Sequence, residues 1–269
     1  ASMLGAVIGD IAGSAYEWNN VKTDDFEMFG EGSRFTDDTV MSCATAEAVL
    51  WLKENNEIAE EYTSKVYATL YKRFYACYPD AGYGAAFAKW AQDDRLFVQG
   101  SYGNGASMRV SPIGFAFDRL DDVLSHAERS CLYTHNNREA ISGAQAVAGS
   151  IFLARRGKTK GEIRRFVQKT AGYDLNFKLR DIRDTYCFSS RTKLSVPVAI
   201  TAFLESDSYE DAVRRAIAVG GDSDTIACVA GGIAQAFYGT IPEWMEIESH
   251  KRLDPKLLGI IEQFQRELM

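Results

Sequence analysis

The stretch GGDSDTIACVAGGIAQAFY, residues 220–238, places a glycine pair and a cluster of polar side chains directly before an apolar run without proline. Asp, Ser and Thr are preferred where a helix begins, so the pattern predicts a helix over residues 226–238. The glycine pair allows the tight backbone turn that would bring Asp222 and Asp224 to the start of this helix. The run contains Gln235 and is too short to span a membrane.

Similar helix signals recur on both sides of this stretch. Apolar residues follow a helical spacing from Met3 to Ile11 and again after Asp38, and the chain has only five prolines in 269 residues. Further start signals are Thr159 with Glu162, Ser208 with Asp211, Asn136 with Glu139, and Asp254 with Pro255. No segment alternates convincingly between apolar and polar residues. The sequence therefore predicts an all-α fold of about ten helices, with long non-helical stretches at residues 18–35 and 100–114.

The composition is that of an ordinary globular protein, with 46% hydrophobic and 25% charged residues. No Pro/Ser-rich linker, composition shift or internal repeat divides the chain, which predicts one compact domain over residues 3–269. Thirty Lys and Arg against 37 Asp and Glu give a net charge of −7, which argues against nucleic acid or an anionic membrane as a direct partner. We expect a monomer.

The N-terminal residues and the cysteines lead to an expectation about location. Ala1 and Ser2 precede Met3 and are expected to be a cloning remnant, and residues 1–5 lack the basic segment of a signal peptide. The five cysteines are far apart, odd in number and without a C-x-x-C pair, which disfavours disulfides and a zinc site. We therefore expect reduced thiols and a cytoplasmic protein.

Two clusters of acidic and hydroxyl side chains each stand directly before a predicted helix: Thr36-Asp37-Asp38-Thr39 and Asp222-Ser223-Asp224-Thr225. Helix capping explains one side-chain oxygen in each cluster, and capping alone stays an alternative. Each cluster, however, holds two carboxylates, which are costly to pack together unless a cation compensates. Oxygen donors without Cys or His favour Mg²⁺, Mn²⁺ or Ca²⁺, and two such clusters face to face would form a two-metal site.

Two glycine-containing segments suggest binding or packing roles. In SYGNGASMR, residues 101–109, small residues would let backbone amides approach an anion, although Asn-Gly is also a common turn signal. Near the N-terminus, Gly5, Gly9 and Gly13 share one helix face, with Asp10 and Glu17 spaced along the same segment. The glycines favour close helix packing, and a buried Asp10 would either bind a metal or support a ligand that does.

Taken together, these motifs resemble those of the ADP-ribosylglycohydrolase family, which includes relatives of dinitrogenase reductase-activating glycohydrolase and the human ADP-ribosyl-acceptor hydrolases. The matching segments are Gly5-x-x-x-Gly9-Asp10-x-x-Gly13-x-x-x-Glu17, Thr36-Asp37-Asp38-Thr39, Ser101-Tyr102-Gly103-Asn104-Gly105, Thr134-His135 and Gly220-Gly221-Asp222-Ser223-Asp224-Thr225. They follow the family's order through most of the chain. One departure is that Asn137 and Arg138 stand where the family often has His and Pro, so no role of that second histidine is carried over.

The resemblance implies an orthogonal multi-helix bundle of the family's type, with a binuclear Mg²⁺ (or Mn²⁺) centre in a cleft. The implied metal ligands are Thr36, Asp37, Asp38, Asp222, Asp224 and Thr225. The implied substrate contacts along the diphosphate of ADP-ribose are Ser101, Tyr102, Gly103, Asn104 and Gly105, with His135 near the diphosphate or the distal ribose. The implied catalytic residues are Glu17, Asp37 and Asp38, and Glu17 would act as a general base or a displaceable ligand on a mobile loop.

The activity that the resemblance implies is metal-dependent hydrolysis of the glycosidic bond between ADP-ribose and a modified protein side chain. ADP-ribosylated protein would be the substrate, ADP-ribose the product, and arginine the preferred acceptor. Alternatives are serine-linked ADP-ribose, a small ADP-ribosyl metabolite, a two-metal phosphoesterase that releases AMP, and a non-catalytic ADP-ribose reader. Intact acidic clusters argue against a reader, because a protein that only binds has little need for two metal ions.

Overall fold

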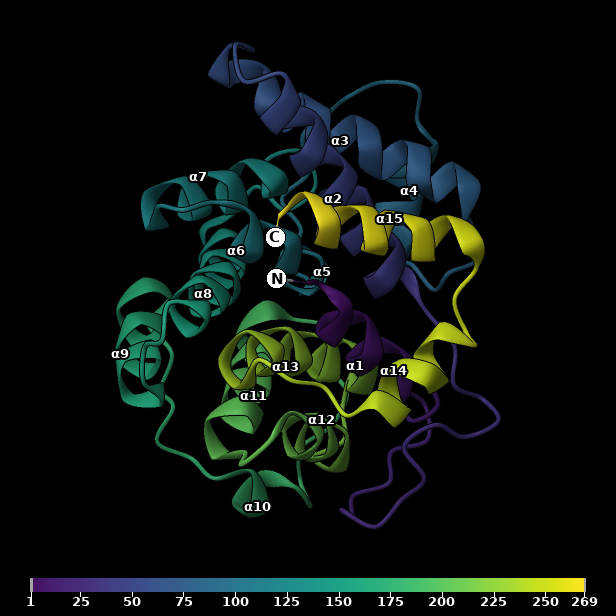
Figure 1. Cartoon of the computed structure of the whole chain (residues 1–269), viewed down its shortest axis with the longest axis vertical. Helices are drawn as coiled ribbons and strands as arrows, with labels where there is room; N and C mark the ends of the chain where they lie inside the picture. Colours follow the sequence, from purple (N-terminus) through teal and green to yellow (C-terminus); the bar gives the residue numbers. More distant parts are fainter. Residues whose placement is uncertain (1, 269) are drawn as a thin grey trace.

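Helix α13 (Ser223–Tyr238) forms where the sequence predicts it. In the computed structural model, which describes residues 2–268, it packs against α1 (Leu4–Ser14), whose residues are all buried. Figure 1 shows α1, in purple, beside α13, in green. Their backbones approach closely because α1 presents glycine to α13: a Cβ on Gly9 would lie only 2.1 Å from the carbonyl oxygen of Ala227. This contact fixes the acidic residues of the two helices, Asp10 and Asp224, relative to one another.

Gly9→Ala is therefore expected to destabilise the fold by about 3 kcal/mol, because the added methyl group pushes the two helices apart. Urea unfolding, followed by circular dichroism, measures the change. Gly259→Ala is the matched control, because a Cβ there meets nothing within 4 Å in helix α15 (Pro255–Glu267). Alanine at that position should stabilise the protein by about 0.5–1 kcal/mol. Similar unfolding midpoints for the two variants would contradict the close α1–α13 packing.

The other helices surround this pair in groups (Figure 1). Their bounds are α2 Asp37–Glu54, α3 Glu60–Cys77, α4 Ala85–Gln92, α5 Gly105–Met108, α6 Ser111–Ala116, α7 Leu120–Cys131, α8 Arg138–Arg155, α9 Lys160–Ala171, α10 Leu179–Ile182, α11 Thr192–Glu205, α12 Tyr209–Ala218 and α14 Glu243–His250. Helices α2, α3, α4 and α15 form one group, and α6 to α9 form another around α8. Helices α11 and α12 pack together on α13.

The all-α prediction is confirmed: residues 2–268 form fifteen helices and no strand. The predicted number of about ten was too low, because the shortest helices have too few turns to show a hydrophobic period. Helices α5 and α6 illustrate this, since α5 lies inside residues 100–114, which the sequence predicts as non-helical, and α6 begins there. The non-helical prediction for residues 18–35 is confirmed. No helix in the described part of the chain is long and apolar enough to cross a membrane.

Most predicted helix starts are correct, including the complete capping box at the start of α9. The start of α8 is displaced by one residue, because Asn137 rather than Asn136 caps it. At the start of α12 the Ser208 hydroxyl caps the helix as predicted, but the Asp211 carboxylate accepts from the amide of Asp207 instead of closing the box. The side chains at these helix starts therefore accept from neighbouring backbone amides whose choice a spacing rule does not fix.

Of the two residues expected to be a cloning remnant, Ala1 lies outside the described residues. Ser2 is buried, and its hydroxyl accepts a hydrogen bond from the amide of Leu4 at 3.1 Å. All five cysteines are free thiols in the structure.

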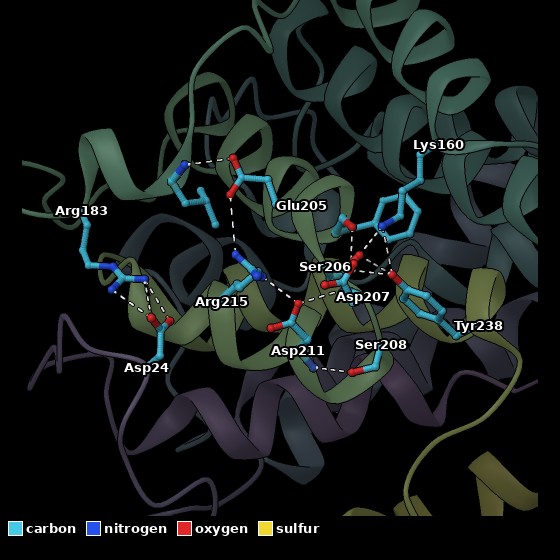
Figure 2. Close-up of polar contacts among 12 residues, drawn as sticks. Asp24, Lys160, Arg183, Glu205, Ser206, Asp207, Ser208, Asp211, Arg215 and Tyr238 are labelled. Carbon is cyan, nitrogen blue, oxygen red and sulfur yellow. Dashed lines mark hydrogen bonds and ion pairs between the residues drawn. The ribbon is translucent and has the colours of Figure 1, made fainter.

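The loop between α1 and α2 is tied to helices that lie far along the chain. The guanidinium of Arg183, just after α10, donates to both carboxylate oxygens of Asp24. Figure 2 shows this pair beside a second network, in which Arg215 of α12 bridges Glu205 and Asp211. The Asp24 pair places the loop against the end of α10, and Arg214 of α12 also holds it by donating to the carbonyls of Asp24 and Phe26.

Candidate metal centre

The two acidic clusters meet at a cavity of about 500 Å³. Its walls come from the N-terminal ends of α2 and α13, from the segment that leads into α5, and from the loops after α1 and before α11. The predicted site residues that line it are Glu17, Asp37, Asp38, Ser101, Gly103, Asn104, Gly105, His135, Asp222, Asp224 and Thr225. Two predicted residues are not part of its lining: Thr36 is buried behind it, and the side chain of Tyr102 is largely exposed.

Asp10 of α1 holds the start of α2. Its buried carboxylate accepts from the amides of Thr36 and Thr39, at 2.9 and 3.1 Å, and from their hydroxyls, at 2.6 and 2.5 Å. Burial raises the pKa of Asp10, and these four hydrogen bonds oppose that rise. With its oxygens engaged in this way, Asp10 orients the turn that presents Asp37 and Asp38 to the cavity.

The start of α13 faces that turn. The Asp222 carboxylate accepts from the side-chain amide of Asn104 at 2.8 Å, and the Asp224 carboxylate accepts from the backbone amide of Thr225 at 2.8 Å. The hydroxyl of Thr225 donates to Asp38 Oδ2 at 3.3 Å. The two clusters, which are far apart in the sequence, are therefore joined by a direct contact.

Two carboxylate triads share Asp224. Oxygens of Asp10, Asp38 and Asp224 lie within 4.8 Å of one another, and so do oxygens of Glu17, Asp222 and Asp224. Burial, followed by the charges of neighbouring carboxylates, raises the pKa of Asp38 well above its ordinary value. Burial likewise raises the pKa of Asp224, and it raises that of Asp222 to about 6. Because these native-state values exceed those of an unfolded chain, ionising the groups at neutral pH opposes folding unless a cation balances them.

The cavity offers a cation suitable ligands and little competition from protein cations. Asp38 Oδ1 is buried and has no hydrogen-bond partner among residues 2–268. Arg109 lines the cavity, but its guanidinium donates to Ser130 O and Thr134 Oγ1 and lies 3.8 Å from the centre of the Tyr71 ring. An all-oxygen donor set suits Mg²⁺ or Mn²⁺ rather than a soft metal. The acidic residues present therefore fit a divalent cation.

Glu17 reaches the cavity from the end of α1, as its position in the sequence predicts. Burial, and then the charges of Asp224 and Asp10, raise the pKa of Glu17 to about 7. The positive charge of Arg34 and a hydrogen bond with Trp18 oppose this rise. A carboxyl group with a pKa near neutrality can exchange a proton at physiological pH, which is the property that a general acid or base needs.

Residues 101–105 form one wall of the cavity, and protein contacts fix their shape. The amides of Ser101, Gly103 and Asn104 all donate to protein acceptors. The side chain of Asn104 reaches Asp222, so this segment supports an acidic cluster as well as lining the cavity. Gly105 is the first residue of α5.

His135 is buried against this wall. Its Nδ1 lies 2.8 Å from Thr134 Oγ1, and burial together with nearby Arg109 lowers its pKa well below the ordinary value. The ring is therefore neutral at physiological pH. A Cβ on Gly105 would lie 3.1 Å from His135 Nε2, which shows that this nitrogen faces the backbone at the start of α5.

An aromatic pair at the cavity has no counterpart among the sequence predictions. Trp18 and Phe188 both line the cavity, and their rings stack with 4.8 Å between centroids and 27° between planes. Trp18 is 76% exposed, which is unusual for so large an apolar side chain and typical of a recognition surface. The two residues lie in different non-helical loops far apart in the sequence, so no spacing could signal the pair.

Fold and site together define an all-α protein with an acidic cavity that fits a divalent cation, and comparison with known proteins gives its family. The ADP-ribosylglycohydrolase family model matches residues 1–267, so this chain belongs to the ADP-ribosylglycohydrolase family. The family resemblance predicted from the motifs is confirmed, and so is the prediction of a glycohydrolase enzyme.

Individual relatives agree with this assignment. ADP-ribosylhydrolase ARH3 of Homo sapiens is 28% identical in an alignment that covers 98% of this chain and 93% of that protein. ADP-ribosylarginine hydrolase Tri1 of Pseudomonas putida is 25% identical in an alignment that covers 91% of this chain and 72% of that protein. A solved structure described as an ADP-ribosylglycohydrolase-related protein complex has the same fold, with a TM-score of 0.69 at 24% identity over 99% of this chain and 96% of that one.

Proposed function

We propose that this enzyme hydrolyses the glycosidic bond between ADP-ribose and an arginine side chain of a modified protein, and that it releases ADP-ribose. The observation that carries the proposal is the convergence of Glu17 and the two carboxylate clusters on one cavity, beside residues 101–105. Membership of the ADP-ribosylglycohydrolase family and the ADP-ribosylhydrolase relatives support this substrate class.

The residues at the cavity that would hold two Mg²⁺ or Mn²⁺ ions are Asp37, Asp38, Asp222, Asp224 and Thr225. Thr36, the sixth ligand that the family resemblance implies, does not line the cavity, and its hydroxyl contacts Asp10 and Asp38. When bound, such ions supply positive charge that activates water and stabilises charge developing on the ribose. The buried Oδ1 of Asp38 without a partner, and the position of Asp224 in both triads, support this ligand set. Asp10 would orient the metal ligands rather than bind an ion itself, because its carboxylate oxygens already accept hydrogen bonds from Thr36 and Thr39.

Proton transfer and binding of the substrate would depend on side chains outside the ligand set. An ordinary glycosidase uses two carboxylates, one as an acid and one as a nucleophile or base. Here the aspartates are assigned to metal ions, which leaves Glu17 to take a proton from the attacking water. Its place beside Asp222 and Asp224, and its pKa near 7, support that role. Neutral His135 would form a hydrogen bond with the diphosphate or the distal ribose.

Two observations support arginine as the acceptor. The side chain of Trp18 forms a hydrogen bond with the Glu17 carboxylate, so its ring is close to the group that would act at the glycosidic bond. Aromatic faces, and that of tryptophan above all, attract the planar guanidinium group. In addition, one relative is named an ADP-ribosylarginine hydrolase.

Peptides ADP-ribosylated at a single arginine or a single serine test the acceptor. We expect kcat/KM for the arginine-linked peptide to be higher by about tenfold or more. Trp18→Leu should reduce this preference, because leucine offers no aromatic face to the guanidinium. Trp244→Leu is the control, because this partly exposed tryptophan is not among the lining residues of the cavity. Faster release from the serine-linked peptide would overturn the arginine assignment.

Gly105→Val is expected to weaken ADP-ribose binding by about tenfold or more while metal binding is retained. The valine side chain would press on His135, whose Nε2 lies 3.1 Å from the Cβ position. Overpacking of this kind shifts side chains and backbone, which would displace His135 and the wall from the ligand. A tenfold loss of affinity corresponds to about 1.4 kcal/mol. Gly161→Val, in the first turn of α9, is the control, because its nearest neighbour is the end of an arginine side chain at 3.7 Å. Equal ADP-ribose affinity of both variants in calorimetry would refute the binding role of this wall.

A further inference from the structure

The loop that follows Glu17 is bound to the glycine turn that precedes Asp222. The side-chain amide of Asn20 donates to the carbonyl of Gly221 at 3.1 Å, and its Oδ1 accepts from the amide of Gly221 at 2.8 Å. The same amide group also donates to the carbonyls of Tyr16 and Glu17. One side chain therefore connects the backbone at Glu17 to the backbone beside Asp222.

Lys22 makes a second connection two residues later. Its ammonium group donates to the carbonyls of Val219, at 2.8 Å, Arg183, at 2.7 Å, and Tyr186. These three bonds use all three donors of the ammonium group. Lys22 has a φ of 55°, the left-handed region that residues other than glycine rarely adopt. A residue is held in this strained conformation only when surrounding contacts determine it, and the three bonds do so here.

The turn that Asn20 and Lys22 contact consists of two glycines, because its backbone is left-handed and neighbouring side chains leave no room for a Cβ. Gly220 and Gly221 have φ values of 81° and 76°, which glycine adopts without strain. A Cβ on Gly220 would lie 2.7 Å from Lys22 Cε, and a Cβ on Gly221 would lie 3.1 Å or less from two ring carbons of Tyr186. The glycine pair is thus required by the side chains that surround the turn as well as by the turn itself.

We propose that Asn20 and Lys22 are positioning residues that hold Glu17 and Asp222 at a fixed separation before any ion binds. Glu17, Asp222 and Asp224 form one of the carboxylate triads, and like charges at this distance repel. Asp222 directly follows the turn at Gly220–Gly221. The hydrogen bonds that Asn20 and Lys22 make to this turn and to the residue before it therefore oppose the repulsion between Glu17 and Asp222. A ligand set that is already in place binds a metal ion more tightly than one that must assemble. This inference rests on the proposed metal-binding role of Asp222 and Asp224, with Glu17 held beside them as the proposed base.

Mg²⁺ titration by calorimetry in the absence of substrate tests the inference. Asn20→Ala is expected to weaken Mg²⁺ binding by about 10–100-fold, the usual effect of losing a residue that supports a metal ligand. Asn19→Ala is the matched control, because the neighbouring Asn19 is exposed and should leave Mg²⁺ affinity unchanged. Lys22→Met should act like Asn20→Ala, since it removes all three donors and keeps the chain length.

The melting temperature of each metal-free variant separates positioning from a merely structural role. A lower melting temperature of Asn20→Ala with wild-type Mg²⁺ affinity would overturn the inference, and so would equal affinities of Asn19→Ala and Asn20→Ala. A wild-type protein that binds Mg²⁺ but releases no ADP-ribose would refute the proposed function and leave this inference standing. A wild-type protein that binds neither Mg²⁺ nor Mn²⁺ would refute both.

Discussion

Asp224→Asn is expected to abolish turnover while the protein still unfolds cooperatively. Asp224 belongs to both carboxylate triads, with Asp10 and Asp38 on one side and Glu17 and Asp222 on the other. Its replacement would therefore remove a ligand from each proposed ion position. Mg²⁺ affinity should fall by more than the ~10–100-fold typical of residues that only support a ligand.

The fold should survive this change because the substitution removes charge from a crowded acidic site. Burial and the neighbouring Asp222 raise the pKa of Asp224, so its ionised form is unfavourable without a cation. Turnover, Mg²⁺ calorimetry and thermal unfolding of the same variant measure the three effects. Asp37→Ala should behave alike, since Asp37 also lines the cavity.

Asp121→Asn is the matched control for these variants. Asp121 lies in the first turn of α7, as Asp37 lies in the first turn of α2, but its side chain is 85% exposed. We expect its turnover and Mg²⁺ affinity to equal those of the wild type. Full activity of Asp224→Asn in the presence of a chelator would show that the acidic clusters are not metal ligands.

Glu17→Gln is expected to lower kcat by ~10²-fold or more while the affinity for ADP-ribose is unchanged. Glutamine keeps the size of the side chain and one acceptor oxygen, but it cannot take a proton from water. The pKa of Glu17, raised to about 7 by burial and by the charges of Asp224 and Asp10, would make the wild-type carboxylate a competent base near neutral pH.

Glu31→Gln provides the control for Glu17→Gln. Glu31 lies in the same loop between α1 and α2, is exposed and does not line the cavity. Its variant should hydrolyse ADP-ribosylated protein at the wild-type rate. If Glu17→Gln shares that rate, then Glu17 only ends a helix and another group must supply the base.

Local sequence together with the family motifs predicted most of the residues that gather at the cavity, although their roles there remain predictions. Asp38 and Asp224 each stand in the first turn of a helix, where short-range capping preferences specify the backbone. The family motifs then indicated that the two turns lie in one cleft. The structure shows the physical basis of that arrangement, because glycine on α1 lets it approach α13 closely and bring Asp10 beneath the start of α2.

Contacts between distant loops could not be predicted in the same way. Asn20 and Gly221 are paired through side-chain and backbone hydrogen bonds, yet neither residue belongs to a periodic pattern. The stacked rings of Trp18 and Phe188 depend on the same placement of loops. Helices α5 and α6 were missed for a different reason, since 4 and 6 residues are too few to show a hydrophobic face.

The identity of the released nucleotide is the most direct test of a metal-dependent glycohydrolase. ADP-ribosylated protein would be incubated with the enzyme in Mg²⁺ and, separately, in excess chelator, and the soluble product would be identified by mass spectrometry. We expect intact ADP-ribose with Mg²⁺ and no release in chelator. Release of AMP would indicate cleavage of the diphosphate by a phosphoesterase, and undiminished release of ADP-ribose in chelator would contradict the metal centre.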